Sequence, residues 1–217
     1  MLAAISLTFA CLAAVAALLV SDWHGLSVWR VISKLAASTF FVLIAVSLGA
    51  LNFTYGQLIL GALLLGWLGD ALLLSRAPKA FMGGLVAFLL SHVLFATAFA
   101  SGGLAVSALA LTSVLAIVFA GVVLRWLLAH TPSTFKRPVI AYVVVIMSMC
   151  VAAAGHAYAS GRWTVLIGAV LFAASDLSVA RDRFVQSGYI NRLWGWPTYF
   201  VAQMVLAWTV ATATGSA

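Results

Sequence analysis

QLILGALLLGWLGDALLL, residues 57–74, is an apolar run long enough to cross a membrane, and it carries a single aspartate, Asp70. A helix needs about 20 apolar residues to span the hydrocarbon core of a bilayer. A second run, WTVLIGAVLFAASDLSVA over residues 163–180, carries Asp176 in the same way. An ionised carboxylate costs about 2.5–3.5 kcal/mol at the centre of a membrane helix, so each aspartate needs a partner or a function.

Apolar runs of this length recur along the whole chain, which is 65% hydrophobic and only 7% charged. This composition is not that of a soluble domain. Continuous runs also argue against a membrane barrel, whose strands alternate apolar and polar residues. The sequence therefore predicts an all-α membrane protein, a bundle of about eight transmembrane helices forming a single integral membrane domain over residues 1–217. The expected helices cover residues 2–20, 31–50, 57–74, 81–100, 104–124, 138–158, 163–180 and 193–213.

The first apolar run is expected to remain as a helix. No Lys or Arg precedes it, and it is longer than the apolar part of a signal peptide. A removed leader that ends near Ala13 and Ala14 is the alternative interpretation.

Lys and Arg are distributed unevenly between the two sets of loops. One set holds nine of them, and the other holds Arg162 alone. Because positive loops stay in the cytoplasm, the pattern predicts a multi-pass protein with both termini outside, in the inner or plasma membrane if the source is bacterial. The charges are scattered over short loops, so the net charge of +7 does not indicate nucleic-acid binding. The nine are Arg30, Arg76, Lys79, Arg125, Lys136, Arg137, Arg181, Arg183 and Arg192.

The third and seventh predicted helices resemble each other near their ends. Gly69 directly precedes Asp70, Ser175 directly precedes Asp176, and both helices run towards the cation-rich loops. The two helices are four apart, which is consistent with a parallel repeat of four plus four helices. Chance similarity between two apolar helices explains the pattern equally well.

Four further polar residues join the aspartates in the predicted membrane region. Lys34 lies one turn into the second helix, His92 near the middle of the fourth, and Tyr199 and Gln203 on one face of the eighth. If the polar faces pack inward, all six residues line one cavity that opens towards the cytoplasmic leaflet. We predict Asp70 and Asp176 as catalytic residues. We predict a substrate-binding role for Lys34, His92, Tyr199 and Gln203.

Each of the four has a simpler interpretation. Lys34 can extend its ammonium group to the membrane interface, and Tyr199 can belong to an aromatic belt. His92 and Gln203 can form hydrogen bonds between helices. Neither aspartate has a Lys or Arg one turn away on its own helix, so a partner must come from another helix.

Two carboxylates and one ammonium group in a poorly hydrated pocket carry one surplus negative charge. One bound proton would make the set neutral. One aspartate would then be an acid and the other a base, as in hydrolases that act through an oxocarbenium-like transition state. This hypothesis requires the two aspartates to lie close together.

Other signals in the sequence are weak. Asp70, Asp176 and His92 could bind a metal, but no ligand spacing supports it, and we expect neither a metal nor a cofactor. Asp22 and Asp182 are expected in loops, solvated beside Arg or His. Cys11 and Cys150 are interpreted as small core residues.

Several short motifs, in this order, resemble the lysoplasmalogenase family of YhhN-like membrane proteins. The similarity extends over roughly residues 30 to 205. The family often has Lys-Pro at the start of the second helix, whereas Leu35 follows Lys34 here, which affects only the local helix geometry. The matching segments are Lys34-Leu35, Gly69-Asp70-Ala71-Leu72, Gly84-Leu85 through Phe88 to Ser91-His92, Gly168-Ala169 through Phe172 to Ser175-Asp176, Ala180, Phe184 and Tyr199-Phe200-Val201-Ala202-Gln203.

The resemblance implies an eight-helix enzyme that cleaves the vinyl-ether bond of lysoplasmalogens. The products would be a fatty aldehyde and glycerophosphocholine or glycerophosphoethanolamine. A lysophospholipid and the bilayer are then the expected partners, with the lipid phosphate near cytoplasmic cations such as Arg76, Lys79, Arg181 or Arg183. Those cations also have the simpler role of fixing topology. A proton-coupled transporter and a metal-dependent lipid amidase or lipid-binding protein are the alternative functions, although prolines expected in or beside loops disfavour a transporter.

Overall fold

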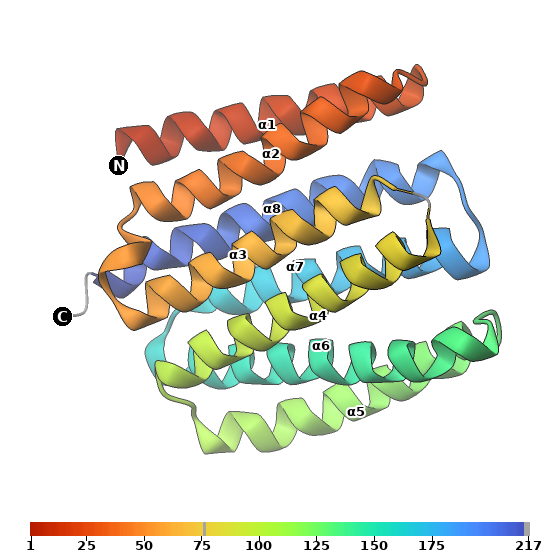
Figure 1. Ribbon diagram of the computed structural model, residues 1–217. Helices are drawn as coiled ribbons and strands as arrows, with labels where there is room; N and C mark the ends of the chain where they lie inside the picture. Colours follow the sequence, from red (N-terminus) through yellow and green to blue (C-terminus); the bar gives the residue numbers. More distant parts are fainter. Residues whose placement is uncertain (76, 215–217) are drawn as a thin grey trace.

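The computed structural model describes residues 1–75 and 77–214 and consists of eight long α-helices that run side by side (Figure 1). A short 3₁₀ turn, η1 (Ala50–Asn52), precedes the third helix, and a π-helical turn, η2 (Arg181–Val185), follows the seventh. No strand occurs within the described residues, so the predicted all-α bundle is confirmed. The helices are α1 (Leu2–Trp23), α2 (Ser27–Ser47), α3 (Thr54–Leu73), α4 (Pro78–Ser101), α5 (Val106–Leu128), α6 (Ser133–Ser160), α7 (Trp163–Ala180) and α8 (Tyr189–Thr214).

The predicted helix ends agree with these bounds to within five residues, and the largest difference lies at the start of α6. Both α6 and α8 begin earlier than their apolar runs, because a helix can continue past the hydrocarbon edge into polar surroundings. Pro138 and Pro197 therefore lie inside helices rather than in or beside loops as expected. Each proline lacks the N–H that would bond the carbonyl four residues earlier. The positions of these prolines therefore do not disfavour a transporter.

Within residues 1–75 and 77–214, seven of the eight helices are long and apolar enough to cross a membrane, and α8 is not among them. The helix α8 carries more polar side chains than the others, and its position accommodates them. It packs on α1, α2, α3 and α7 (Figure 1), and its polar residues Tyr199, Gln203 and Thr209 are buried among these neighbours. A helix shielded from lipid by protein can carry polar side chains that a lipid-facing helix cannot.

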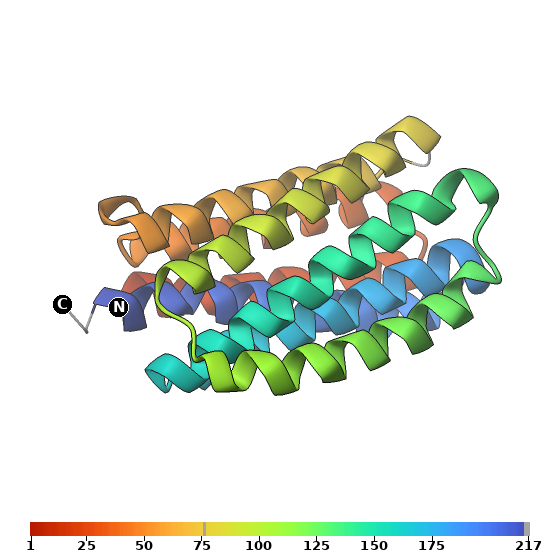
Figure 2. The same ribbon diagram turned by 90° about the horizontal axis from the view of Figure 1, so that it is seen from below.

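The contacts between helices repeat along the chain. The pairs α1–α2, α2–α3 and α3–α4 pack together, and so do the corresponding pairs α5–α6, α6–α7 and α7–α8. Across the bundle, α2 packs on α8 as α6 packs on α4. These matched pairs are consistent with a parallel repeat of four plus four helices, which stays a prediction. The halves are not identical, since α5 lies along an edge of the bundle and packs mainly on α6 (Figures 1 and 2).

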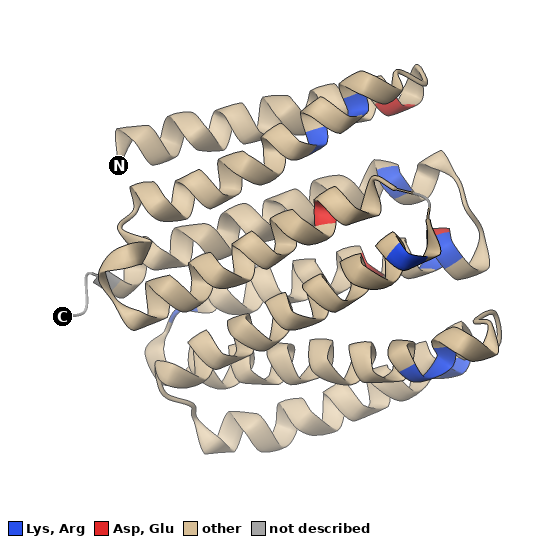
Figure 3. Cartoon of the chain, viewed as in Figure 1, with Lys and Arg blue, Asp and Glu red and all other residues tan. Residues whose placement is uncertain are grey.

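Charged residues gather at one end of the bundle (Figure 3), where the connections after α1, α3, α5 and α7 lie. The connection between α6 and α7, which contains Arg162, lies at the opposite end (Figure 1). The start of α1 and the end of α8 also lie at that opposite end (Figure 1). The loops predicted to share one side therefore do share one end, while the cytoplasmic location of this end stays a prediction.

The expectation that Asp22 is solvated is wrong. Asp22 belongs to the last turn of α1, and its side chain is only 2% exposed. Its two carboxylate oxygens bind Arg30 at 3.2 Å and Arg192 at 2.7 Å. Asp182, in η2, is partly exposed, and it accepts hydrogen bonds from the Gly188 backbone and the Asn191 side chain. Asp22 thus connects the start of α2 to the start of α8.

Candidate active site

Asp70, in the last turns of α3, lies in a buried network of donors. The Lys34 ammonium group of α2 is 3.2 Å from Oδ1, and the hydroxyls of Ser38 and Tyr199 donate to Oδ2 at 2.5 and 2.8 Å. Asp70 and Lys34 are 2% and 6% exposed, so Lys34 does not extend to the membrane interface. Three donors, one of them cationic, stabilise the ionised form of this carboxylate.

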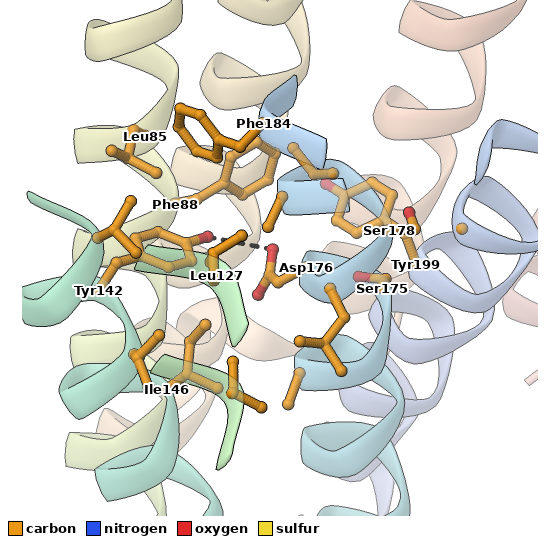
Figure 4. Close-up of a pocket in the computed structure, with 18 of the residues that line it drawn as sticks. Leu85, Phe88, Leu127, Tyr142, Ile146, Ser175, Asp176, Ser178, Phe184 and Tyr199 are labelled. Carbon is orange, nitrogen blue, oxygen red and sulfur yellow. Dashed lines mark hydrogen bonds between the residues drawn. The ribbon is translucent and has the colours of Figure 1, made fainter. Parts of the chain in front are cut away.

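Asp176, in α7, has a different set of partners. The Tyr142 hydroxyl of α6 donates to Oδ1 at 3.1 Å, as the dashed line in Figure 4 shows. His92 Nε2 of α4 lies 3.1 Å from Oδ2, although the two atoms are not aligned as a conventional hydrogen bond. The imidazole ring stacks on Phe172, with 4.1 Å between ring centroids. Packing and hydrogen bonding thus hold the imidazole against one oxygen of the carboxylate.

The second nitrogen of His92 constrains the position of protons at this pair. Nδ1 lies 2.6 Å from the carbonyl oxygen of Phe88, which can only accept, so Nδ1 carries a hydrogen. Nε2 and the Asp176 oxygen are both buried and have no other hydrogen-bonding partner among the described residues. If neither atom carried a proton, the lone pairs of His92 Nε2 and Asp176 Oδ2 would repel each other at 3.1 Å. The contact is favourable only when one further proton lies on either His92 or Asp176.

Both aspartates line one cavity of about 120 Å³, as predicted. Lys34 and Tyr199 also line it, whereas His92 and Gln203 are not among its lining residues. Its remaining walls are mainly apolar and come from α4, α5, α6 and α7, including Leu85, Leu127 and Ile146 in Figure 4. Four of the six predicted residues therefore share a mainly apolar cavity. His92 instead contacts Asp176 from outside the cavity wall.

Gln203 is fully buried, and neither its amide nitrogen nor its amide oxygen has a hydrogen-bonding partner among the described residues. It follows Tyr199 by one helical turn, and the two side chains approach the same place, next to Gly66 of α3. A buried primary amide without partners is costly unless water binds to it. Gln203 thus lies behind Tyr199, outside the cavity.

Tyr142 and Ser38 were not identified from the sequence. Ser38 is one turn beyond Lys34 on α2, a spacing that could have been noticed. Tyr142 could have been found from the repeat, because it precedes Asp176 by nearly the same interval as Lys34 precedes Asp70. Both residues donate to an aspartate, so they complete the polar surroundings of the cavity.

Within residues 1–75 and 77–214, no group of three or more His, Cys, Asp or Glu side chains is arranged to hold a metal ion. The residues around the cavity can therefore supply carboxylate, imidazole, phenol and ammonium groups. Such a set can donate a proton, accept one and stabilise a nearby positive charge.

Comparison with known proteins identifies relatives across most of the chain. The YhhN family model matches residues 29–210. Lysoplasmalogenase TMEM86A of Bos taurus is 32% identical over 146 residues, which cover 64% of this chain and 59% of the relative. Lysoplasmalogenase TMEM86B of Homo sapiens is 34% identical over 152 residues, covering 70% of this chain and 62% of the relative. TMEM86B of Mus musculus is also 34% identical, over 149 residues covering 69% and 61%.

The matched region spans less than two thirds of the length of these relatives. No solved structure matches the chain. The family match nevertheless includes every helix that contributes to the cavity, from Lys34 of α2 to Tyr199 of α8.

Proposed function

The chain belongs to the YhhN family, and on that premise we propose that it is a lysoplasmalogenase. In this proposal the protein hydrolyses the vinyl-ether bond of a lysoplasmalogen to a fatty aldehyde and glycerophosphocholine or glycerophosphoethanolamine. The curated relatives are named for this activity. The observation that carries the proposal is that two aspartates, Asp70 buried and Asp176 partly buried, line one mainly apolar cavity in different surroundings.

Vinyl-ether hydrolysis needs an acid, a negative charge and a base in turn. A proton adds to the outer carbon of the double bond and leaves an oxocarbenium ion between the inner carbon and the ether oxygen. Water then attacks the inner carbon and loses a proton, giving a hemiacetal. The hemiacetal collapses to the aldehyde as the glycerol oxygen regains a proton. A positioned acid accelerates the first step, and a nearby carboxylate stabilises the cation.

The two aspartates suit different parts of this sequence. Asp176 shares a proton with His92 and lines the cavity, so it is the proposed acid. Asp70 is surrounded by three donors that favour its ionised form, so it is the proposed counter-charge for the oxocarbenium ion. After the proton transfer, Asp176 is itself a carboxylate and can accept a proton from the attacking water.

This assignment modifies the simpler hypothesis that the aspartates share one proton between them. Each carboxylate has its own partners, and the proton that neutralises the set is placed on the His92–Asp176 pair. The total charge is unchanged. Lys34 and Asp70 balance each other, and the proton balances Asp176.

The decisive experiment uses purified protein, a lysoplasmalogen in detergent micelles and a measurement of released aldehyde. The matched control substrate is the saturated 1-alkyl lysophospholipid, which has no double bond to protonate and should release no aldehyde. The variant Asp176→Asn serves as the protein control. Absence of aldehyde from the vinyl ether, with protein shown to be folded, would contradict the proposed activity.

The same preparation distinguishes the alternatives. A proton-coupled transporter should move substrate or protons across proteoliposomes without releasing aldehyde. A lipid amidase should release a fatty acid from an amide-linked lipid. The prolines inside α6 and α8 do not by themselves favour transport, since neither residue lines the cavity that contains the aspartates.

The structure supports a multi-pass integral membrane protein, and we further propose that the cation-rich end faces the cytoplasm. The asymmetry of the loop cations supports this orientation. The cavity lies nearer to that end, because both aspartates belong to the last turns of α3 and α7. A lysophospholipid in the cytoplasmic leaflet would then bring its ether bond to the depth of the aspartates.

A further inference from the structure

A second cavity, of about 550 Å³, lies at the charged end of the bundle. Three arginines line it, one each from α2, η2 and α8: Arg30, Arg183 and Arg192. Among the described residues that line it, one carries a carboxylate, Asp182, and its side chain is partly exposed. We call this space the end cavity.

The arginines of the end cavity are held in place rather than freely solvated. Buried Asp22 binds Arg30 at 3.2 Å and Arg192 at 2.7 Å, so it fixes two guanidinium groups side by side. The guanidinium of Arg183 lies over the ring of Phe81, 4.3 Å from its centroid. Ordering these long side chains in advance lowers the entropy lost when they bind an anion.

The charged side chains in and beside the end cavity have a net charge that suits one bound anion. Arg30, Arg183 and Arg192 contribute three positive charges, and Asp22 and Asp182 contribute two negative ones. Lys34 also lines the end cavity, but Asp70 balances it. Among the described residues of this cluster one positive charge remains, and it matches a phosphodiester, which carries one negative charge. Guanidinium groups are well suited to phosphate because they can donate two hydrogen bonds in one plane.

The end cavity and the cavity of the aspartates share part of their walls. Lys34, Leu73, Phe81, Ser178, Val179 and Trp196 line both. A molecule that fills both spaces would meet arginines at one end and apolar side chains at the other, with the aspartates between. The apolar part includes Phe119 of the peripheral helix α5, which is 47% exposed and therefore adjoins the lipid. A single-chain phospholipid has this distribution of polarity.

We infer that the end cavity is the binding site for the phosphodiester of a single-chain phospholipid, whose tail lies in the adjoining cavity. The reaction at the tail rests on the proposed function, whereas the binding of the phosphodiester does not. Among the cations first considered for the phosphate, Arg183 lines the end cavity. Arg181 instead binds Asn191 and Gln186, Lys79 is not a lining residue, and Arg76 lies outside the described residues.

The test measures binding by calorimetry in detergent with uncleavable ligands. The probes are 1-O-hexadecyl-lysophosphatidylcholine and 1-O-hexadecylglycerol, which share a tail and differ in the phosphodiester headgroup. We expect the wild-type protein to bind the phospholipid at least about tenfold more tightly, as one or two charge-assisted hydrogen bonds would give. Arg183→Gln should remove most of this difference, and Arg183→Lys should restore part of it.

Arg137→Gln is the matched control, because Arg137 is exposed near the same end and lines neither cavity. It should keep the full preference. Equal binding of the two probes by the wild-type protein, or an equal loss in Arg137→Gln and Arg183→Gln, would overturn the inference. Arg30→Gln and Arg192→Gln should weaken the preference as well, provided that thermal unfolding shows a folded protein.

Two competitors distinguish a lipid headgroup from free phosphate. Glycerophosphocholine should displace the lipid probe at lower concentration than inorganic phosphate does. Equal displacement by inorganic phosphate would assign the end cavity to free phosphate and contradict the phosphodiester assignment. None of these binding measurements depends on cleavage. If the protein did not hydrolyse vinyl ethers, the expected binding preference would therefore still support the headgroup site.

Discussion

Asp70 and Asp176 occupy equivalent positions in the two halves of the bundle. Asp70 of α3 is bound from α2 and α8, and Asp176 of α7 is bound from α6 and α4. A shift of four helices converts the first set of helices into the second. The side chains differ between the halves, since a lysine and a tyrosine bind Asp70 where a tyrosine and a histidine contact Asp176. The two aspartates thus have similarly arranged neighbouring helices, and the different side chains on those helices give them different surroundings.

Replacing either aspartate by asparagine should lower kcat for vinyl-ether cleavage by at least about a hundredfold. Asp176→Asn removes the proposed acid, and Asp70→Asn removes the negative charge next to the developing cation. Aldehyde release under saturating substrate measures both effects. Near-normal turnover by either folded variant would exclude that residue from the mechanism.

Asp70→Asn also leaves the buried Lys34 ammonium group without its counter-charge. This variant can therefore unfold for reasons unrelated to catalysis. The double variant Lys34→Met/Asp70→Asn removes both charges and should unfold at a temperature closer to that of the wild type. If this double variant is folded and retains full activity, Asp70 has no catalytic role.

His92→Gln should lower kcat by about tenfold or more and leave KM within about twofold of the wild-type value. His92 lies 3.1 Å from Asp176 but does not line the cavity, so substrate contacts should be retained. The pH profile of kcat should also change, because His92 contacts the proposed acid. A large rise in KM with an unchanged pH profile would point to a packing role for His92 instead.

Lys34→Ala should change the pH profile of activity. The variant removes the cation 3.2 Å from Asp70, which is the one charged partner of this carboxylate among the described residues. Activity should persist at the new optimum, since Ser38 and Tyr199 still donate to Asp70. A profile that superposes on that of the wild type would show that the ammonium group has no influence on the reaction.

Gly69→Ala should destabilise the protein by about 1–3 kcal/mol and raise KM. A methyl group at Gly69 would lie 2.6 Å from the ring of Phe88, which lines the cavity next to Asp70. The ring would have to move, and its displacement would change the cavity. Thermal unfolding and steady-state kinetics measure the two effects.

Gly121→Ala is the control for this glycine replacement, because nothing lies within 4 Å of the added methyl group on α5. It should be neutral or slightly stabilising, as alanine favours a helix over glycine by about 1 kcal/mol. Equal unfolding temperatures for the two variants would contradict the close packing of Phe88 on Gly69.

Prolonged treatment with a chelator should leave vinyl-ether cleavage unchanged. The proposed acid and counter-charge are side chains, and the described residues contain no cluster of ligands arranged for a metal. Activity measured before and after removal of the chelator provides the comparison. Loss of activity that added Zn²⁺ or Mn²⁺ restores would require a metal in the mechanism.

Much of the cavity could be predicted because charged side chains are so rare in the membrane spans. Asp70 and Asp176 stood out against apolar runs, and four of the six predicted residues line the same cavity. His92 was placed in the site, although the structure puts it behind Asp176 and not in the cavity wall. Tyr142 was missed, because its one signal was its spacing from Asp176, which is close to that of Lys34 from Asp70.

The loops were predicted less well than the spans. Asp22 was expected to be solvated, yet it is buried beneath two arginines from other helices. Its partner Arg192 is 170 positions away in the chain, a separation that local sequence patterns do not report. The arginines of the end cavity could be recognised as a group only after the helices were packed.

The sequence by itself determined the number and extent of the helices and the end at which the cations collect, because apolar length and loop charge act locally. It also indicated that the two aspartates needed partners. Only the tertiary structure decided which partners they have. Side chains that face lipid and side chains that face other helices are about equally apolar, so the sequence pattern leaves the rotation of each helix open. Packing between helices sets that rotation and brings Lys34 to Asp70 and His92 to Asp176.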